Sequence, residues 1–159
     1  MRARHYILNE LIFFSVKDGA LQARQQYLDL LENIEPDRQV RSYLKWDGKV
    51  PSGAILHSTS WRYDVTRQSL VLSWVIYPDP SPDQRASPVD RYSPSFQPDA
   101  THSAPREGEA VEAVAHAAHH LSLLSKTDPS FLNALLKDPA LSDALRKYAP
   151  SETFDSSIE

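Results

Sequence analysis

Apolar residues in the first half of the chain change their spacing from segment to segment, and each spacing predicts a different element. Residues 6–16 form a nearly continuous apolar run, which is typical of a central strand. From residue 20 to residue 34 apolar side chains recur at three- and four-residue intervals, which predicts a helix that ends before Pro36. Asp18-Gly19 between the two segments is a turn signal.

The following segments favour strands. Residues 38–46 alternate between two sides, and Arg41, Tyr43 and Lys45 share one side. Residues 53–63 and 69–77 predict a hairpin across residues 64–68. We therefore expect an α+β domain over residues 1–77, with a small, mainly antiparallel sheet in the order β-α-β-β-β and one helix packed on a face.

The second half of the chain has a different character. Residues 78–106 are rich in Pro, Ser and Asp and poor in apolar side chains, which predicts a disordered linker. Residues 107–149 predict an acidic helical region, and residues 150–159 a flexible tail. The chain is therefore expected to consist of two small modules joined by a tether.

An internal repeat lies in the helical region. Residues 128–137 and 138–147 each begin with Asp-Pro and end in Lys, a pattern that predicts two short helices with an Asp cap and Pro in the first turn. The repeat resembles the Asp-Pro-rich helical modules of chaperone-organising co-chaperones, whose short helices form a groove for apolar segments. Any two well-capped short helices would show the same pattern.

Charge and cysteine content bear on the cellular compartment in which the protein is expected. The formal net charge is −4, divided between +2 for residues 1–77 and −6 for residues 78–159. Cysteine is absent, which removes thiolate chemistry and fits a reducing compartment. Neither a signal peptide nor an apolar run of membrane-spanning length is visible, so we expect a cytoplasmic protein with no membrane partner.

Histidines one helical turn apart are the only metal-ligating pattern. His116 and His120 follow Glu112 at four-residue spacing, and such a pair can bind zinc. The apolar residues of the segment occupy the opposite side, so this stripe is expected to face solvent. A closed site needs ligands from a second element, and none is evident in the sequence. His116 and His120 are therefore weak metal candidates, and we expect no cofactor.

Aromatic and basic residues alternate along the predicted strands and suggest a binding surface. One helix covers only one face of a sheet, so the other face would expose Arg41, Tyr43, Lys45 and Arg62 as candidate partner-binding residues. Trp61 is expected on the covered face with Ile55, and Arg62 on the open face. The alternative is that the aromatic side chains pack in the core. The near-neutral charge of the domain makes nucleic acid an unlikely partner.

No catalytic signature is present. His57 and the three hydroxyl residues after it lie in a predicted strand, without an exposed nucleophile or an orienting acid, and no Gly-rich phosphate loop occurs. We therefore predict a non-enzymatic protein–protein interaction or assembly factor, with self-association possible. Two alternatives remain: a small enzyme or ligand binder that uses polar groups around the sheet, such as His5, His57 and Arg62, and a sheet-based RNA-binding protein.

Overall fold

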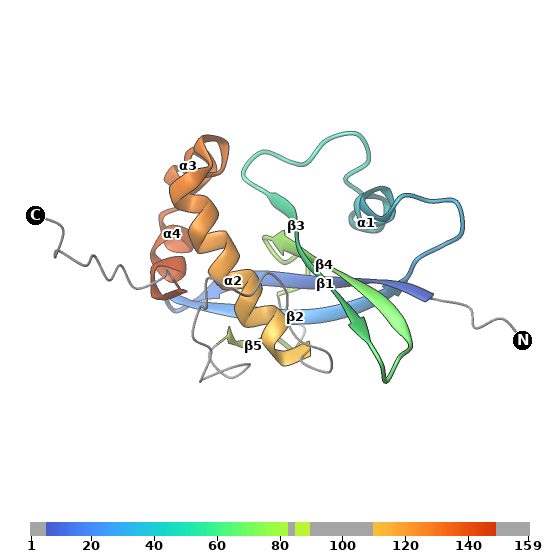
Figure 1. Ribbon diagram of the computed structural model, residues 1–159. Coiled ribbons are helices and arrows are strands. Elements are labelled where there is room, and N and C mark those ends of the chain that lie inside the picture. The colour runs from blue at the N-terminus through green and yellow to red at the C-terminus, as the bar shows by residue number, and fades with distance from the viewer. Residues whose placement is uncertain (1–5, 83–84, 90–109, 149–159) are drawn as a thin grey trace, which may run out of the picture.

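The computed structural model describes residues 6–82, 85–89 and 110–148, without the side chains of residues 110–112. These residues form a five-stranded mixed sheet and four α-helices, which confirms the α+β class (Figure 1). The strand order is β3-β4-β1-β2-β5. The strands are β1 (Tyr6–Lys17), β2 (Ala20–Asp29), β3 (Ile55–Asp64), β4 (Ser69–Tyr77) and β5 (Ser87–Pro88).

Strand β1 occupies the centre of the sheet, as its apolar run predicts. It pairs in parallel with β4 and antiparallel with β2, while the pairs β3–β4 and β2–β5 are antiparallel. Leu11, Ile12, Phe13 and Phe14 are all buried, because helices cover both faces of the sheet at this point. A continuous apolar run is the sequence signature of such a position.

The helix predicted for residues 20–34 is wrong, because most of this segment forms β2. Asp18 and Gly19 both have positive φ, 52° and 76°, and make the two-residue turn of a hairpin with β1. Leu21 and Ala23 are buried two residues apart, which is the period of a strand. The tight turn returns the chain to β1, and ladder pairing overrides the helix propensity of the segment.

The strand predicted for residues 38–46 is also wrong, because helix α1 (Pro36–Leu44) occupies most of this segment. Pro36 stands in the first turn of the helix, where its missing N–H and fixed φ are tolerated, so it starts a helix and does not end one. Lys45 terminates α1 in the left-handed conformation. The observed order is therefore β-β-α-β-β in place of β-α-β-β-β.

Strands β3 and β4 confirm the hairpin predicted across residues 64–68. Their register contains a shift, because Ser58 pairs with Trp74 whereas Ser60 pairs with Ser73. Thr59 is the extra residue, and it forms a β-bulge. Because of this extra residue, the residues of β3 after Thr59 face the side opposite to the one that strict alternation from Ile55 predicts. The bulge therefore decides which way Trp61 and Arg62 point.

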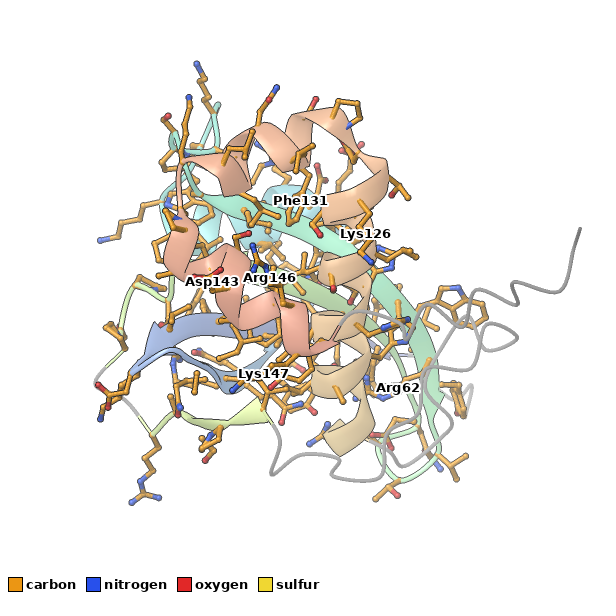
Figure 2. The ribbon with its side chains drawn as sticks, turned by 90° about the vertical axis from the view of Figure 1, so that its left-hand side faces the viewer. Arg62, Lys126, Phe131, Asp143, Arg146 and Lys147 are labelled. Carbon is orange, nitrogen blue, oxygen red and sulfur yellow. The ribbon has the colours of Figure 1, made fainter. Side chains whose placement is uncertain are left out.

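The C-terminal helices pack on the sheet and share its core. Helices α2 (Ala110–Thr127), α3 (Pro129–Leu136) and α4 (Pro139–Leu145) lie together, apart from α1 (Figure 1). Figure 2 shows the same helices from the side, with Phe131 on α3 and the exposed ion pair of Asp143 and Arg146. We call the sheet face that they cover the α2 face, and the opposite one the α1 face. The buried cluster on the α2 face joins strand and helix residues, among them Ile12, Phe14, Val75, Ala117, Leu121 and Leu145.

Both Asp-Pro repeats begin helices, as their sequence predicts. The Asp128 carboxylate accepts hydrogen bonds from the backbone N–H groups of Ser130 and Phe131, at 2.9 and 3.3 Å. Asp138 accepts from the backbone N–H of Leu141 at 3.1 Å. The second cap is also tied to the sheet, because the Tyr77 hydroxyl donates to Asp138 Oδ2 at 2.7 Å. Burial and the Asp138 charge both raise the pKa of Tyr77, so its hydroxyl stays protonated and donates.

Part of the predicted linker packs against the sheet. Strand β5 pairs with β2, and the buried Asp79 carboxylate accepts two hydrogen bonds from the Arg24 guanidinium, at 2.7 and 3.1 Å. The remaining residues of the predicted linker, 83–84 and 90–106, and the predicted tail lie outside the described residues. None of the helices described within residues 6–148 combines the length and apolar character that crossing a membrane requires.

Candidate functional site

An aromatic surface lies on the α1 face, beside α1 and without cover from it. The register places Trp61 opposite Leu72, and Tyr63 opposite Leu70, which in turn pairs with Ile7. Trp61 and Tyr63 are 63% and 43% exposed. We call these five residues the Trp61 surface. Because β3 is the last strand on its side of the described sheet, this surface also adjoins an open sheet edge.

Helix α1 stops short of this surface because it is fixed over another part of the same face. Its Val40 packs with Leu11, Phe13 and Ile76. Asn9 on β1 ties α1 to the sheet: its amide donates to the Pro36 carbonyl and to Gln39 Oε1, at 3.3 and 2.7 Å. The oxygen of the same Asn9 amide accepts from the indole N–H of Trp74 at 2.9 Å. Trp74 is therefore held in the fold by a hydrogen bond and by packing, whereas Trp61 is largely open to solvent.

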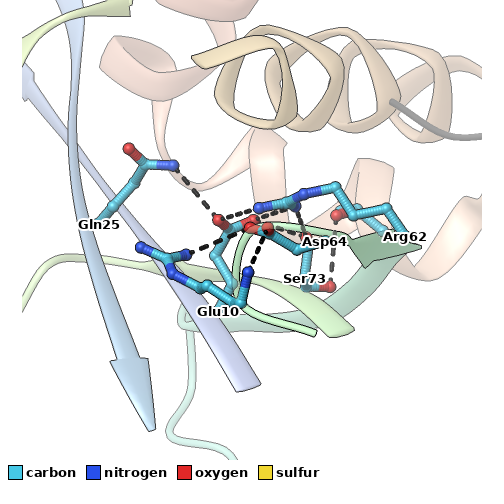
Figure 3. A network of polar contacts seen from close by, with 7 residues as sticks. Glu10, Gln25, Arg62, Asp64 and Ser73 are labelled. Carbon is cyan, nitrogen blue, oxygen red and sulfur yellow. Dashed lines mark hydrogen bonds and ion pairs between the residues drawn. The ribbon is translucent and has the colours of Figure 1, made fainter. Parts of the chain in front are cut away.

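A buried polar network occupies the opposite face, under α2. Glu10 is fully buried on β1, and its two carboxylate oxygens accept from the two terminal nitrogens of Arg62 at 2.9 and 2.8 Å (Figure 3). The Ser73 hydroxyl donates to Glu10 at 2.7 Å, and Gln25 lies at 3.5 Å from the second oxygen. A buried carboxylate is stable only when paired and hydrogen-bonded in this way.

The surroundings of this network extend to the β3–β4 turn. The Arg67 guanidinium lies over the ring of Tyr27, 4.0 Å from its centroid. Burial first, and then the nearby Glu10 carboxylate, raise the pKa of the Tyr27 hydroxyl. Since Arg62 and Ser73 occupy the Glu10 oxygens, the carboxylate is engaged inside the protein and not presented to a ligand. The geometry is that of a structural ion pair.

The position of Arg62 corrects the sequence-based expectation. Arg62 was expected on the open face and Trp61 on the covered one, but Arg62 is 3% exposed and Trp61 is exposed. The Thr59 bulge causes the reversal, because it restores Arg62 to the same face as Ile55. The binding surface predicted around Arg62 is therefore part of the interior.

The other candidate partner-binding residues lie elsewhere. Arg41 and Tyr43 belong to α1 and Lys45 is its C-terminal cap, so they do not share a strand face. Tyr43 and Lys45 are exposed and Arg41 is half-buried. Helix α1 packs on the face opposite to Arg62. The structure therefore does not bring the four predicted residues together, and it exposes Trp61 and Tyr63 in their place.

His57 on β3 meets His120 on α2, and His116 lies beside His120. The Nε2 atoms of His57 and His120 are 3.2 Å apart, and their rings are stacked with centroids 5.3 Å apart. The ring of His116, one helical turn away, lies 6.2 Å from that of His120. His116 and His120 are half-buried, so the expectation that they face solvent without a second element is wrong: β3 supplies His57.

Burial controls the charge of these histidines. It lowers the pKa of His57, His116 and His120, and neighbouring histidines lower the last two further. Asp128 acts in the opposite direction on His57. All three imidazoles are therefore predominantly neutral at pH 7. Within the described part of the chain, no three His, Cys, Asp or Glu side chains are already grouped as a metal site.

No family model and no curated protein matches this chain.

Two features of the site could not be predicted from the sequence. The exposure of Trp61 depends on the Thr59 bulge, which Ser58-Thr59-Ser60 does not reveal. The contact of His57 with His120 joins residues 63 positions apart in the chain. The helical spacing of His116 and His120 was the one available signal for this second feature.

Proposed function

We propose that this protein is a non-enzymatic interaction factor that binds an extended segment of another protein at the edge strand β3. The observation that carries the proposal is Trp61, which is 63% exposed on β3, a strand whose outer edge pairs with no described residue. Trp and Tyr dominate the energy of protein interfaces, because they offer a large apolar area at low conformational cost. We place this activity in the cytoplasm, on the absence of cysteine.

The chemistry of the edge supports an extended partner. A free edge presents a row of backbone donors and acceptors that an added strand can satisfy, while pockets and aromatic side chains beside it select the partner's residues. Natural edge strands are normally protected by Lys or other charges. From Ile55 to Trp61, β3 contains no Asp, Glu, Lys or Arg, and its two charged residues, Arg62 and Asp64, are buried. An edge without exposed charge next to exposed aromatic side chains is suited to a partner with apolar side chains.

The Thr59 bulge limits the part of the edge that can extend the sheet. A bulge interrupts regular pairing, so a partner strand cannot pair continuously along the whole of β3. A partner segment can instead pair with residues 60–64 alone. That half of β3 also carries Trp61 and Tyr63.

The test uses a display library of unstructured ten-residue peptides. Peptides that bind the full chain are selected from the library, and their affinities for it are measured. We expect apolar peptides that protect the amides of residues 60–64 from hydrogen exchange. Trp61→Ser should lower the affinity of these peptides by about thirtyfold, which is the effect of losing one interface hot spot. Leu136→Ser is the matched control, because Leu136 is an equally exposed apolar residue on α3, 71% accessible. It should change the affinity less than about twofold.

Three results would reject the proposal. One is selection of no peptide. A second is equal affinity for the Trp61→Ser and wild-type chains. The third is sedimentation of the purified wild-type chain as a dimer that Trp61→Ser dissociates, because the surface would then be covered by a second copy.

A further inference from the structure

The contact between His57 and His120 joins two elements far apart in the sequence. His57 lies on β3, and His120 on α2, with the two Nε2 atoms 3.2 Å apart. Two imidazole nitrogens that bind one zinc ion, each at about 2.0–2.1 Å and at a tetrahedral angle, are separated by about 3.3–3.4 Å. The observed separation therefore already matches the spacing of two ligands of a single ion.

A third imidazole lies within one helical turn. His116 and His120 occupy positions i and i+4 of α2, which places both on the same side of the helix. The ring centroids of His116 and His120 are 6.2 Å apart, compared with 5.3 Å for His57 and His120. A three-nitrogen arrangement would require the His116 ring to move closer to the other two, because no three such side chains of the described residues are already grouped as a metal site.

We propose that His57 and His120 bind a divalent transition metal ion of the zinc type between β3 and α2, with His116 as the third ligand. Imidazole nitrogens are ligands that Zn²⁺, Ni²⁺ and Cu²⁺ accept readily. The Asp128 carboxylate lies close enough to His57 to interact with it electrostatically, and its negative charge favours a cation here. Water completes the coordination.

Such an ion would connect the helical layer to the sheet. Helix α2 carries Ala117 and Leu121 into the core of the α2 face, and His120 lies between them in sequence on its β3 side. A metal bridge from His120 to His57 would bind the folded chain and not the unfolded one, so it would stabilise the docked position of α2. This site is separate from the Trp61 surface, which lies on the opposite face.

The experiment titrates Zn²⁺ into the full chain in competition with a chromophoric chelator. We expect one saturable ion per chain, with the affinity reduced at least about tenfold in His57→Gln and in His120→Gln. His119→Gln is the matched control. It is the neighbouring histidine of the same helix, but its Nδ1 lies 3.0 Å from the Tyr148 carbonyl, so its substitution should change zinc affinity less than about threefold.

A second readout uses the wild-type chain and does not depend on the folding of any variant. At one equivalent of Zn²⁺, the imidazole ring resonances of His57, His116 and His120 should shift together and saturate, while that of His119 should move less. Absence of saturable binding overturns the proposal. So does binding that His57→Gln leaves unchanged in a folded chain, or a set of shifted resonances that omits His57.

Discussion

At the scale of single residues, one inserted position in β3 determines which side chains are buried. Strict alternation from Ile55 would place Trp61 inside and Arg62 outside. Thr59 has no partner in the register, so Arg62 instead lies on the Ile55 face and pairs with Glu10. The buried ion pair and the exposed Trp61 are therefore two consequences of the same bulge.

The Glu10–Arg62 pair gives the prediction at this scale. Arg62→Met should lower the free energy of unfolding by about 3–5 kcal/mol, because the Glu10 charge stays buried without its partner. Adding Glu10→Met removes that charge, and the double variant should regain most of the loss. Urea unfolding of the wild type, the two single variants and the double variant measures the coupling energy between the two side chains. Strictly additive losses would show that the two side chains do not interact as described.

At the scale of elements, the sequence determines the strands that combine an apolar pattern with clear boundaries. Strand β4 agrees with the predicted residues 69–77, and β1 with the predicted central run, because burial on both faces requires continuous apolar side chains. Both Asp-Pro starts also form as predicted, since a cap acts within one helical turn.

The exchange of β2 and α1 has a physical cause that local patterns do not contain. Residues 20–34 include good helix formers, and residues 38–46 alternate, so propensity and period both favour the wrong element. Pairing with β1 decides the first segment, and Pro36 at a helix start decides the second. The exposure of Trp61 depends on the Thr59 bulge, and the His57–His120 contact joins two segments far apart in the chain. Neither can be predicted from a short stretch of sequence.

The two Asp caps provide a matched prediction for the helices. Asp128→Ala should cost about 1 kcal/mol of stability, since the hydrogen bonds described for its carboxylate all cap α3. Asp138→Ala should cost about 2 kcal/mol or more, because Asp138 also accepts the Tyr77 hydroxyl from β4. Thermal melts of both variants, with Tyr77→Phe as the control for the second bond, test this difference. Equal losses for the two caps would contradict the link between α4 and the sheet.

At the scale of the whole molecule, the sheet is covered unequally. Helices α2–α4 share one core with β1, β2, β3 and β4, so the helical half completes the sheet domain. Helix α1 buries only part of the other face. What remains there is the Trp61 surface beside the open edge of β3, and the proposed function rests on this surface being dispensable for folding.

The most direct measurement compares Trp61→Ala with Trp74→Ala, the same substitution on the same face. Trp74 is hydrogen-bonded to Asn9 and packed against the buried cluster on the α1 face, so its loss should lower the free energy of unfolding by roughly 3 kcal/mol. The loss of the exposed Trp61 should change it by less than about 1 kcal/mol. Urea unfolding of both variants decides between these outcomes. If Trp61→Ala is as destabilising as Trp74→Ala, Trp61 belongs to the core and the proposed binding surface does not exist.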